Sequence, residues 1–157
     1  MTFPKLNLRE TELFIGDDTL IALTDFLCTR KRIFFLADFR TMRKCLPLIE
    51  SLLPEEKEVH TLVIQEGERF KNINTSLLLW KQLQQLEANR NDLFVNVGGG
   101  VVCDMGAFVA STFKRGMEFI NVPTSLMAMS DAAIGGKAGI DLENVKNQCM
   151  HFFLFWK

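Results

Sequence analysis

The chain has 157 residues, a length that fits one domain with a substantial apolar core. Its composition is 48% hydrophobic and 24% charged with a formal net charge of -1, which excludes a disordered chain and a basic nucleic-acid-binding surface. No apolar stretch reaches the roughly 20 residues of a membrane span, and the N-terminus lacks the apolar segment of a secretory signal. We therefore expect a cytoplasmic protein that binds a small molecule, with no nucleic-acid or membrane partner.

Four cysteines, at positions 28, 45, 103 and 149, show no CxxC spacing and lie in apolar surroundings. This pattern is typical of buried, reduced thiols and not of a disulfide framework or a zinc knuckle. It agrees with a cytoplasmic location.

Strand-like and helix-like patterns alternate in the first half of the chain. A short strand over 12–15 precedes a helix capped by Asp17 and Asp18. The continuous apolar run at 33–37 predicts a strand covered on both faces, and a helix over 41–53 follows it, kinked at Pro47.

The alternation continues with a strand over 59–64 and an amphipathic helix over 74–86. A strand at 93–97 then runs into three glycines, an apolar helix follows, and the next strand covers 119–122. Five strands separated by helical segments predict an α/β fold of the Rossmann-like type, with a doubly wound, mainly parallel sheet.

Gly98, Gly99 and Gly100 stand where a parallel strand ends and a helix begins. Ligands bind at this edge of such sheets, and the free N–H groups of the helix start attract anions. Without Cβ atoms the glycines can approach a diphosphate closely and adopt positive φ angles. The segment is not the GxGxxG fingerprint, because position 103 is cysteine. A nucleotide site and a plain strand-to-helix turn both remain open at this point.

Acidic residues accompany the same edge of the sheet. Asp104 falls in the first turn of the apolar helix, where it suits the helix dipole or accepts a bond from a ligand. Asp38 ends the 33–37 strand, where an acidic side chain takes ribose hydroxyls or simply caps a turn. Taken alone, the charged segment at 66–71 is typical of a solvated loop.

Groups suited to phosphate crowd into the 33 residues from 115 to 147. Arg115, the run 123–125, Asp131, the run 135–137 and the pair 146–147 supply cations, hydroxyls and an amide beside two glycine turns. Arginine and lysine bind phosphate as a fork and as a point charge, and glycine permits close approach.

With these spacings, GGGVVCD followed by RG, PTS, D, GGK and KN resembles the 3-dehydroquinate synthase family, and the likeness extends back through EGERFK to Asp38. The resemblance implies NAD as cofactor, a divalent metal (zinc or cobalt), a homodimer, and a place in the shikimate pathway of aromatic amino acid biosynthesis. The implied reaction converts the sugar phosphate 3-deoxy-D-arabino-heptulosonate 7-phosphate into 3-dehydroquinate and inorganic phosphate.

The resemblance also implies roles for individual residues. Asp131, Lys137 and Asn147 would contact substrate, and Arg115 would complete the phosphate pocket of a neighbouring subunit. The NAD site would be lined by Asp38, Glu68, Lys71, Gly99, Gly100, Val101, Asp104, Thr124, Ser125 and Lys146.

Some positions depart from the family pattern. Arg40 replaces a small polar residue beside the adenosine, Ser125 replaces a threonine, and Ala107 replaces a glycine. The family carries its metal ligands, a Glu and two His, in a C-terminal helical domain, and neither His60 nor His151 lies in a comparable pattern.

We expect residues 1–148 to form the NAD-binding domain and 149–157 (CMHFFLFWK) to be an apolar tail outside the family pattern. This suggests a truncated or frame-shifted product that lacks the helical domain and is inactive alone. A sibling sugar-phosphate cyclase and a non-catalytic nucleotide-binding module remain alternatives. Iron-type alcohol and glycerol dehydrogenases fit less well. They have a lysine three residues after the motif aspartate, and the corresponding position after Asp104 is Ala107.

Overall fold

A computed structural model describes residues 5–8, 11–16, 19–134, 137–142 and 145–152. The strands are β1 (Lys5–Leu8), β2 (Thr11–Phe14), β3 (Arg32–Asp38), β4 (Glu58–Ile64), β5 (Leu93–Gly98), β6 (Glu118–Pro123), β7 (Lys137–Leu142) and β8 (Val145–Phe152). The α-helices are α1 (Thr19–Cys28), α2 (Phe39–Lys44), α3 (Leu46–Glu50), α4 (Ile73–Gln85) and α5 (Gly100–Thr112). Three shorter helical segments are η1 (Glu68–Phe70), η2 (Phe113–Arg115) and the π-helical η3 (Ala128–Ala132).

The centre of the fold is a parallel sheet that, in the described residues, has four strands in the order β4-β3-β5-β6. From β3 the chain crosses to β4 on one side, then returns past β3 to β5 and continues to β6. The direction of winding therefore reverses between β3 and β5, which confirms the doubly wound α/β fold. In such sheets the ligand crevice lies at the carboxyl ends of the two strands where the order reverses.

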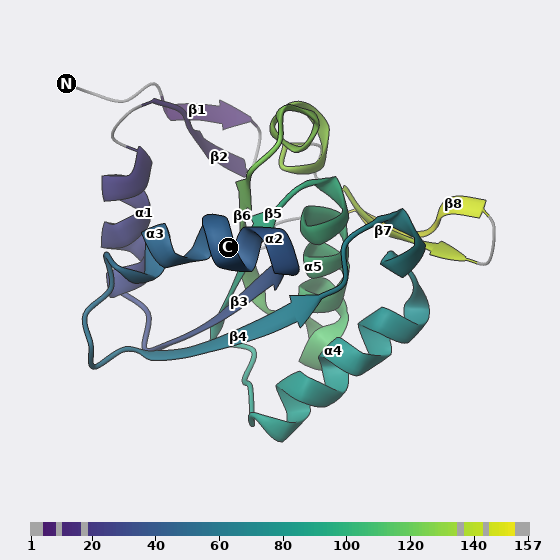
Figure 1. Cartoon of the computed structure of the whole chain (residues 1–157), viewed down its shortest axis with the longest axis horizontal. Helices are drawn as coiled ribbons and strands as arrows, with labels where there is room; N and C mark the ends of the chain where they lie inside the picture. The colour runs from purple at the N-terminus through teal and green to yellow at the C-terminus, as the bar shows by residue number, and fades with distance from the viewer. Residues whose placement is uncertain (1–4, 9–10, 17–18, 135–136, 143–144, 153–157) are drawn as a thin grey trace.

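Both faces of this sheet are covered by apolar side chains. Phe34 and Leu36 of β3 pack with residues of α4 and α5, whereas Ile33 and Phe35 pack with residues of α1 and α3. All four are fully buried. Figure 1 shows α4 and α5 on one side of the sheet and α1, α2 and α3 on the other. The continuous apolar run of β3 is explained by this two-sided burial.

Three local predictions differ from the structure. The 12–15 strand is β2, which pairs antiparallel with β1 in a separate two-stranded sheet. The helix expected over 41–53 is two short helices that meet at Cys45, with Pro47 in the first turn of the second. The hairpin of β7 and β8 had no counterpart in the prediction. The expected helix cap at 17–18 lies outside the described residues.

All four cysteines are free, as predicted. The prediction that the cysteines are buried is correct for Cys103, where desolvation raises the thiol pKa to about 12. It is wrong for Cys28, which is exposed at the end of α1. In the part of the chain that the structure describes, no helix is long and apolar enough to cross a membrane.

The side chain of Asn96 sets how closely α5 can pack on the sheet. Asn96, fully buried in β5, donates from Nδ2 to the Oδ1 atom of Asn121 in β6 at 2.8 Å. Its own Oδ1 lies where a side chain on Gly106 would stand, 1.8 Å from the position of a Cβ atom. Gly106 is therefore required for close packing of α5 on β5.

We predict that Gly106→Ala lowers the free energy of unfolding by about 1–3 kcal/mol, because the new methyl group overlaps the Asn96 amide. In the Asn96→Ala background the same change should cost nothing or stabilise the helix. Urea unfolding measures both effects. Gly100→Ala is the matched control, since no atom lies within 4 Å of its Cβ position; an equal loss in both glycine variants would contradict the packing argument.

Candidate functional site

The glycine loop forms the carboxyl end of β5 and the start of α5. Gly99 caps α5 without a side-chain hydrogen bond, so the first N–H groups of the helix face outward. Space is open where Gly100 would carry a Cβ, and only the Ser125 hydroxyl oxygen, at 3.5 Å, lies near the Cβ position of Gly99. Gly98 has a packing role instead, since its Cβ would lie 2.5 Å from Val102.

The prediction of positive φ angles in this loop is wrong. Described glycines with positive φ are Gly16, Gly67 and Gly116, and none of them belongs to the loop. The loop glycines are needed because they lack a side chain, and not because they adopt a left-handed backbone.

Asp38 ends β3 beside this loop. Ala37 of β3 pairs with Val97 of β5, so Asp38 stands level with Gly98 on the neighbouring strand, about 5 Å away in the sheet. Its Oδ1 accepts from the backbone N of Thr41 at 2.8 Å and from the Thr41 hydroxyl at 3.0 Å. Asp38 is thus the N-cap of α2, which fixes a carboxylate at the point where the winding of the sheet reverses.

Lys71 is the centre of a polar cluster at the same edge. Its ammonium group, with the side chain only 4% exposed, lies 2.6 Å from Asp104 Oδ2 and 2.7 Å from Asn147 Oδ1. Glu68 Oε1 is 4.0 Å from this ammonium group and 3.6 Å from that of Lys146. Five residues predicted for the site therefore meet around one buried lysine, although the chain separates them by up to 79 positions (68 to 147).

Asp104 carries the main charge opposite Lys71. Burial raises the pKa of its carboxyl group, the hydrogen bond and charge of Lys71 lower it, and the charges of Asp131 and Glu68 raise it. The placement of Asp104 in the first helical turn is wrong, because it is the fifth residue of α5 and the first turn has no acidic residue. Its partner is the lysine and not the helix dipole.

Asp141, a residue that the sequence reasoning missed, holds Asn147 in place. Asp141 Oδ1 accepts from the Asn147 backbone N, and the Asp141 backbone N donates to the Lys71 carbonyl, both at 2.8 Å. Asn147 itself has a positive φ of 53°, a conformation that asparagine tolerates better than most residues. The signal available in the sequence was an aspartate and an asparagine flanking a short polar turn, six residues apart.

The remaining predicted residues lie in three places. Thr124, Ser125 and Val101 adjoin the glycine loop, where the Thr124 backbone N donates to Gly98 O at 2.9 Å and Ala128 N donates to Ser125 Oγ at 3.3 Å. Asp131 is exposed in η3, and its charge acts on Asp104. Lys137 begins β7, but its side chain and the glycine turn at 135–136 lie outside what the structure describes.

Arg115 does not join this cluster. It precedes β6, at the amino edge of the sheet, whereas the loop and Lys71 lie at the carboxyl edge. The six residues of β6 separate the two edges by about 20 Å. Arg115 is exposed, has a positive φ of 71°, and forms no ion pair with any described residue.

The described residues contain no group of three or more His, Cys, Asp or Glu side chains that could hold a metal ion. His60 lies in β4, where its ring stacks on Phe34 with centroids 5.0 Å apart and its Nε2 lies 3.1 Å from Glu58 Oε1. Within the described ranges, the residues therefore do not fit a divalent metal.

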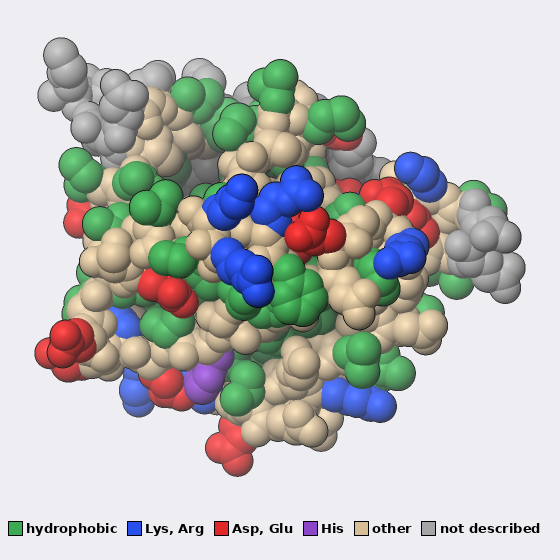
Figure 2. Space-filling model, viewed as in Figure 1, with side chains coloured by type: hydrophobic (Ala, Val, Ile, Leu, Met, Phe, Trp, Pro, Cys, Tyr) green, Lys and Arg blue, Asp and Glu red, His purple; other side chains and the backbone are tan. Residues whose placement is uncertain are grey.

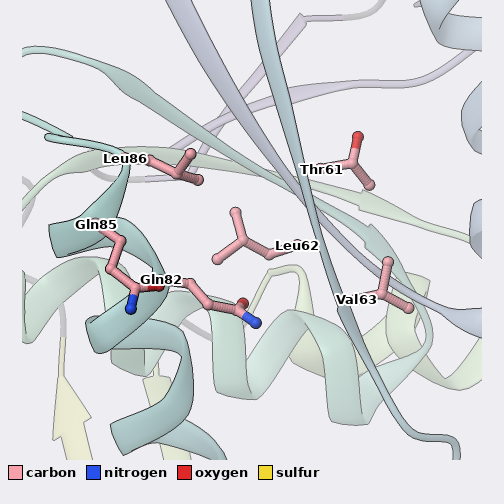
Figure 3. Close-up of a pocket in the computed structure, with 6 residues that line it drawn as sticks. All are labelled: Thr61, Leu62, Val63, Gln82, Gln85 and Leu86. Atoms are coloured by element: carbon pink, nitrogen blue, oxygen red, sulfur yellow. The ribbon is translucent and has the colours of Figure 1, made fainter.

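An open pocket lies away from this cluster, between β4 and the C-terminal half of α4 (Figure 3). Gln82 and Gln85 of α4 and Leu86, which follows the helix, line it together with residues 61–63 of β4. None of the predicted site residues borders it. We therefore place the candidate site at the glycine loop and Lys71, where charged groups, free helix N–H groups and open space coincide.

A doubly wound sheet with an uncapped glycine-rich helix start and a fixed carboxylate on the adjacent strand defines the class of Rossmann-like α/β domains. The family model described as "3-dehydroquinate synthase N-terminal" matches residues 61–155. The chain belongs to this 3-dehydroquinate synthase family.

Individual relatives agree. A 3-dehydroquinate synthase of Parabacteroides distasonis is 40% identical over 148 residues, which cover 93% of this chain and 42% of that protein. A 3-dehydroquinate synthase of Chlamydia muridarum is 50% identical over 108 residues, 69% of this chain and 29% of that protein. The chain thus spans less than half the length of the curated relatives it matches.

Solved structures show the same fold at lower identity. A 2-deoxy-scyllo-inosose synthase, crystallised with carbaglucose-6-phosphate, NAD+ and Co2+, superposes with a TM-score of 0.83 at 23% identity over 97% of this chain and 43% of that chain. A 2-epi-5-epi-valiolone synthase from Streptomyces hygroscopicus, with NAD+ and Zn2+ bound, gives a TM-score of 0.80, also at 23% identity, over 97% of this chain and 43% of that chain.

We predict that Lys71→Met lowers the free energy of unfolding by about 2–3 kcal/mol, because it leaves the Asp104 carboxylate without its cation; partial exposure of Asp104 keeps the loss below that of a fully buried pair. The double variant Lys71→Met/Asp104→Leu should lose less than the sum of the two single variants, by about 1–3 kcal/mol. Urea unfolding at pH 7 measures this coupling.

Lys81→Met is the matched control for that cycle. Lys81 is exposed on α4, and its removal should change the free energy of unfolding by no more than about 0.5 kcal/mol. Strict additivity of the Lys71 and Asp104 variants would show that the ion pair does not organise the site.

Proposed function

We propose that this chain is the NAD-binding half of a 3-dehydroquinate synthase, acting in the conversion of 3-deoxy-D-arabino-heptulosonate 7-phosphate into 3-dehydroquinate and phosphate. The observation that carries the proposal is the convergence of Lys71, Asp104 and Asn147 beside the open start of α5. This arrangement puts a cation, a carboxylate and an amide next to a helix N-terminus, which suits a dinucleotide together with a phosphorylated, hydroxyl-rich substrate.

The residues of the loop fit a dinucleotide. Open space at Gly100 and the uncapped N–H groups of α5 accommodate a diphosphate, whose charge the helix start favours. Asp38 stands where ribose hydroxyls are taken in doubly wound folds, and Thr124 and Ser125 border the loop. Glu68, Val101 and Lys146 complete the proposed NAD site. When bound, NAD supplies a hydride acceptor that can return the same hydride.

The sugar phosphate would lie between the loop and the β7–β8 hairpin. Asn147 is oriented by Asp141 and Lys71, so its amide is fixed before substrate arrives. Lys71 holds the carboxylate of Asp104 at 2.6 Å, which leaves that carboxylate able to accept from a ligand hydroxyl. Asp131 and Lys137 are the further substrate contacts in this proposal.

Cyclisation requires more than these residues. The curated relatives are more than twice as long as the region they share with this chain, and the described residues supply no metal-ligand group. We propose that the metal, zinc or cobalt, is held by residues outside the region shared here, and that the 157 residues alone bind NAD without completing a turnover.

NAD binding is tested directly by calorimetric titration and by thermal unfolding. NAD should bind saturably and raise the unfolding temperature of the chain. Gly100→Ala should retain the stability of the parent yet weaken NAD binding at least about tenfold, because its methyl group fills the space left for the diphosphate. Absence of both heat and a thermal shift with the parent chain would overturn the proposal.

We propose that the protein acts as a homodimer in which Arg115 completes the phosphate pocket of the neighbouring subunit. Its place at the amino edge, exposed and remote from Lys71 of its own chain, supports a role between subunits. Exposed Leu126, Met127 and Met129 beside η3 add apolar surface suited to association. We also propose residence in the cytoplasm, which the four free thiols favour.

Light scattering at tens of micromolar protein should give a mass about twice 17.9 kDa. Leu126→Asp should shift the equilibrium toward monomer, because a charge at this 81% exposed position opposes burial in an interface. Leu48→Asp, the same change at a 64% exposed leucine of α3, is the control. A strictly monomeric parent chain would contradict the dimer.

A sibling sugar-phosphate cyclase is the second candidate function, because the inosose and valiolone synthases share the fold. Turnover assays with a full-length relative that carries these residues would separate the substrates. A non-catalytic nucleotide-binding module would bind NAD, but a full-length relative that carries this domain in place of its own would be inactive. A dehydrogenase function is less well supported, because Ala107 stands where the iron-type alcohol and glycerol dehydrogenases have a lysine.

A further inference from the structure

A group of cations borders the proposed dinucleotide site on one face of α2. Arg40, Arg43 and Lys44 are exposed and stand three and four positions apart, so they share a face of the helix. Figure 2 shows Lys and Arg side chains gathered around an acidic group near the middle of the view, over the position of α2 in Figure 1. None of the roles described so far uses these three cations.

Arg40 is anchored at the end of the sheet. Its Nη2 lies 3.0 Å from Glu66 Oε2, and the two side chains are 69% and 43% exposed. Glu66 follows β4, so the pair spans the carboxyl ends of two adjacent strands. A guanidinium group has five N–H donors, and one contact with Glu66 leaves most of them available to a ligand.

The position of Arg40 relative to Asp38 suggests which ligand. Asp38 caps α2 and Arg40 is the second residue of that helix, so the guanidinium belongs to the turn that follows the ribose-binding carboxylate. In doubly wound folds an arginine near that carboxylate accommodates the 2′-phosphate that distinguishes NADP from NAD. Two carboxylates, Asp38 and Glu66, oppose three cations here, which leaves a net charge of +1 around this turn.

We propose that Arg40, supported by Arg43 and Lys44, forms a subsite for a phosphate on the adenosine ribose, so that the chain binds NADP as well as NAD. The proposal rests on the dinucleotide site proposed above. The charge of Asp38 opposes such a phosphate, but hydrogen bonds from Thr41 N and Oγ1 to its Oδ1 and the three nearby cations offset this repulsion. Arg40 is then a specificity residue that acts at the far end of the cofactor from the glycine loop.

Calorimetric titration of the 157-residue chain with NAD+ and with NADP+ tests the subsite. We expect a Kd for NADP+ within about tenfold of that for NAD+. Arg40→Asn should weaken NADP+ at least about tenfold and NAD+ no more than about threefold, because only NADP+ carries the 2′-phosphate. Arg90→Asn, an equal change of charge before β5 at the opposite edge of the sheet, should leave both constants unchanged.

Glu66→Gln is the second variant, chosen because it keeps Arg40 and removes its competing partner; it should tighten NADP+ binding without affecting NAD+. Binding of NAD+ with no measurable binding of NADP+ would overturn the subsite while leaving the proposed function intact. Equal effects of Arg40→Asn and Arg90→Asn would also overturn it, since they would indicate unspecific attraction. Failure to bind either dinucleotide would overturn the proposed function and the subsite together.

Discussion

The site depends on the burial of one lysine. The Lys71 side chain is only 4% exposed, and an ammonium group in that position is stable only if charge and hydrogen bonds replace water. Asp104 of α5 and Asn147 of β8 supply them, so three segments distant in sequence must approach one point. The requirement to satisfy Lys71 therefore also attaches the β7–β8 hairpin to the sheet.

The backbone reinforces this attachment. Asp141 of β7 donates its N–H to the Lys71 carbonyl, and Asn72 forms a parallel bridge with Asp141. The hairpin is thus anchored to Lys71 in two ways. The main-chain carbonyl of Lys71 accepts from Asp141 of β7, and its ammonium group donates to Asn147 of β8. Asn147, a proposed substrate contact on the hairpin, therefore takes its position from the same lysine that neutralises Asp104.

The local patterns in the sequence predicted the sheet well because they report burial. The run at 33–37 became β3, with every residue of it fully buried, and the leucine stripe of 74–86 became α4 at 73–85. The β7–β8 hairpin could not be found in the same way, because the sequence from 137 to 152 mixes apolar and polar residues without a regular alternation. The short strand β2 was found, but no local pattern indicates that it pairs with β1 instead of joining the parallel sheet.

Five residues of the Lys71 cluster could be named from the sequence, but their contacts with one another could not. Asp104 and Lys71 are 33 positions apart, and Lys71 and Asn147 are 76 apart, so no local spacing encodes their contact. The resemblance to a family placed them in one site, yet it did not show that Asp104 faces a lysine instead of the helix dipole. With Gly99 as the N-cap, Asp104 is the fifth residue of α5 and lies one position beyond the first turn.

The glycines show that residue type alone does not reveal why a residue is needed at its position. Gly98 and Gly106 are required because neighbouring side chains, Val102 and Asn96, occupy the space of a Cβ. Gly100 has open space at the same position, so none of the residues that the structure describes demands the absence of a side chain there. Gly100 therefore differs from Gly98 and Gly106 in having no packing role among the described residues. The open space beside Gly100 lies at the start of α5, where Gly99 provides no side-chain cap, so the first N–H groups of the helix can donate to the anion that we propose.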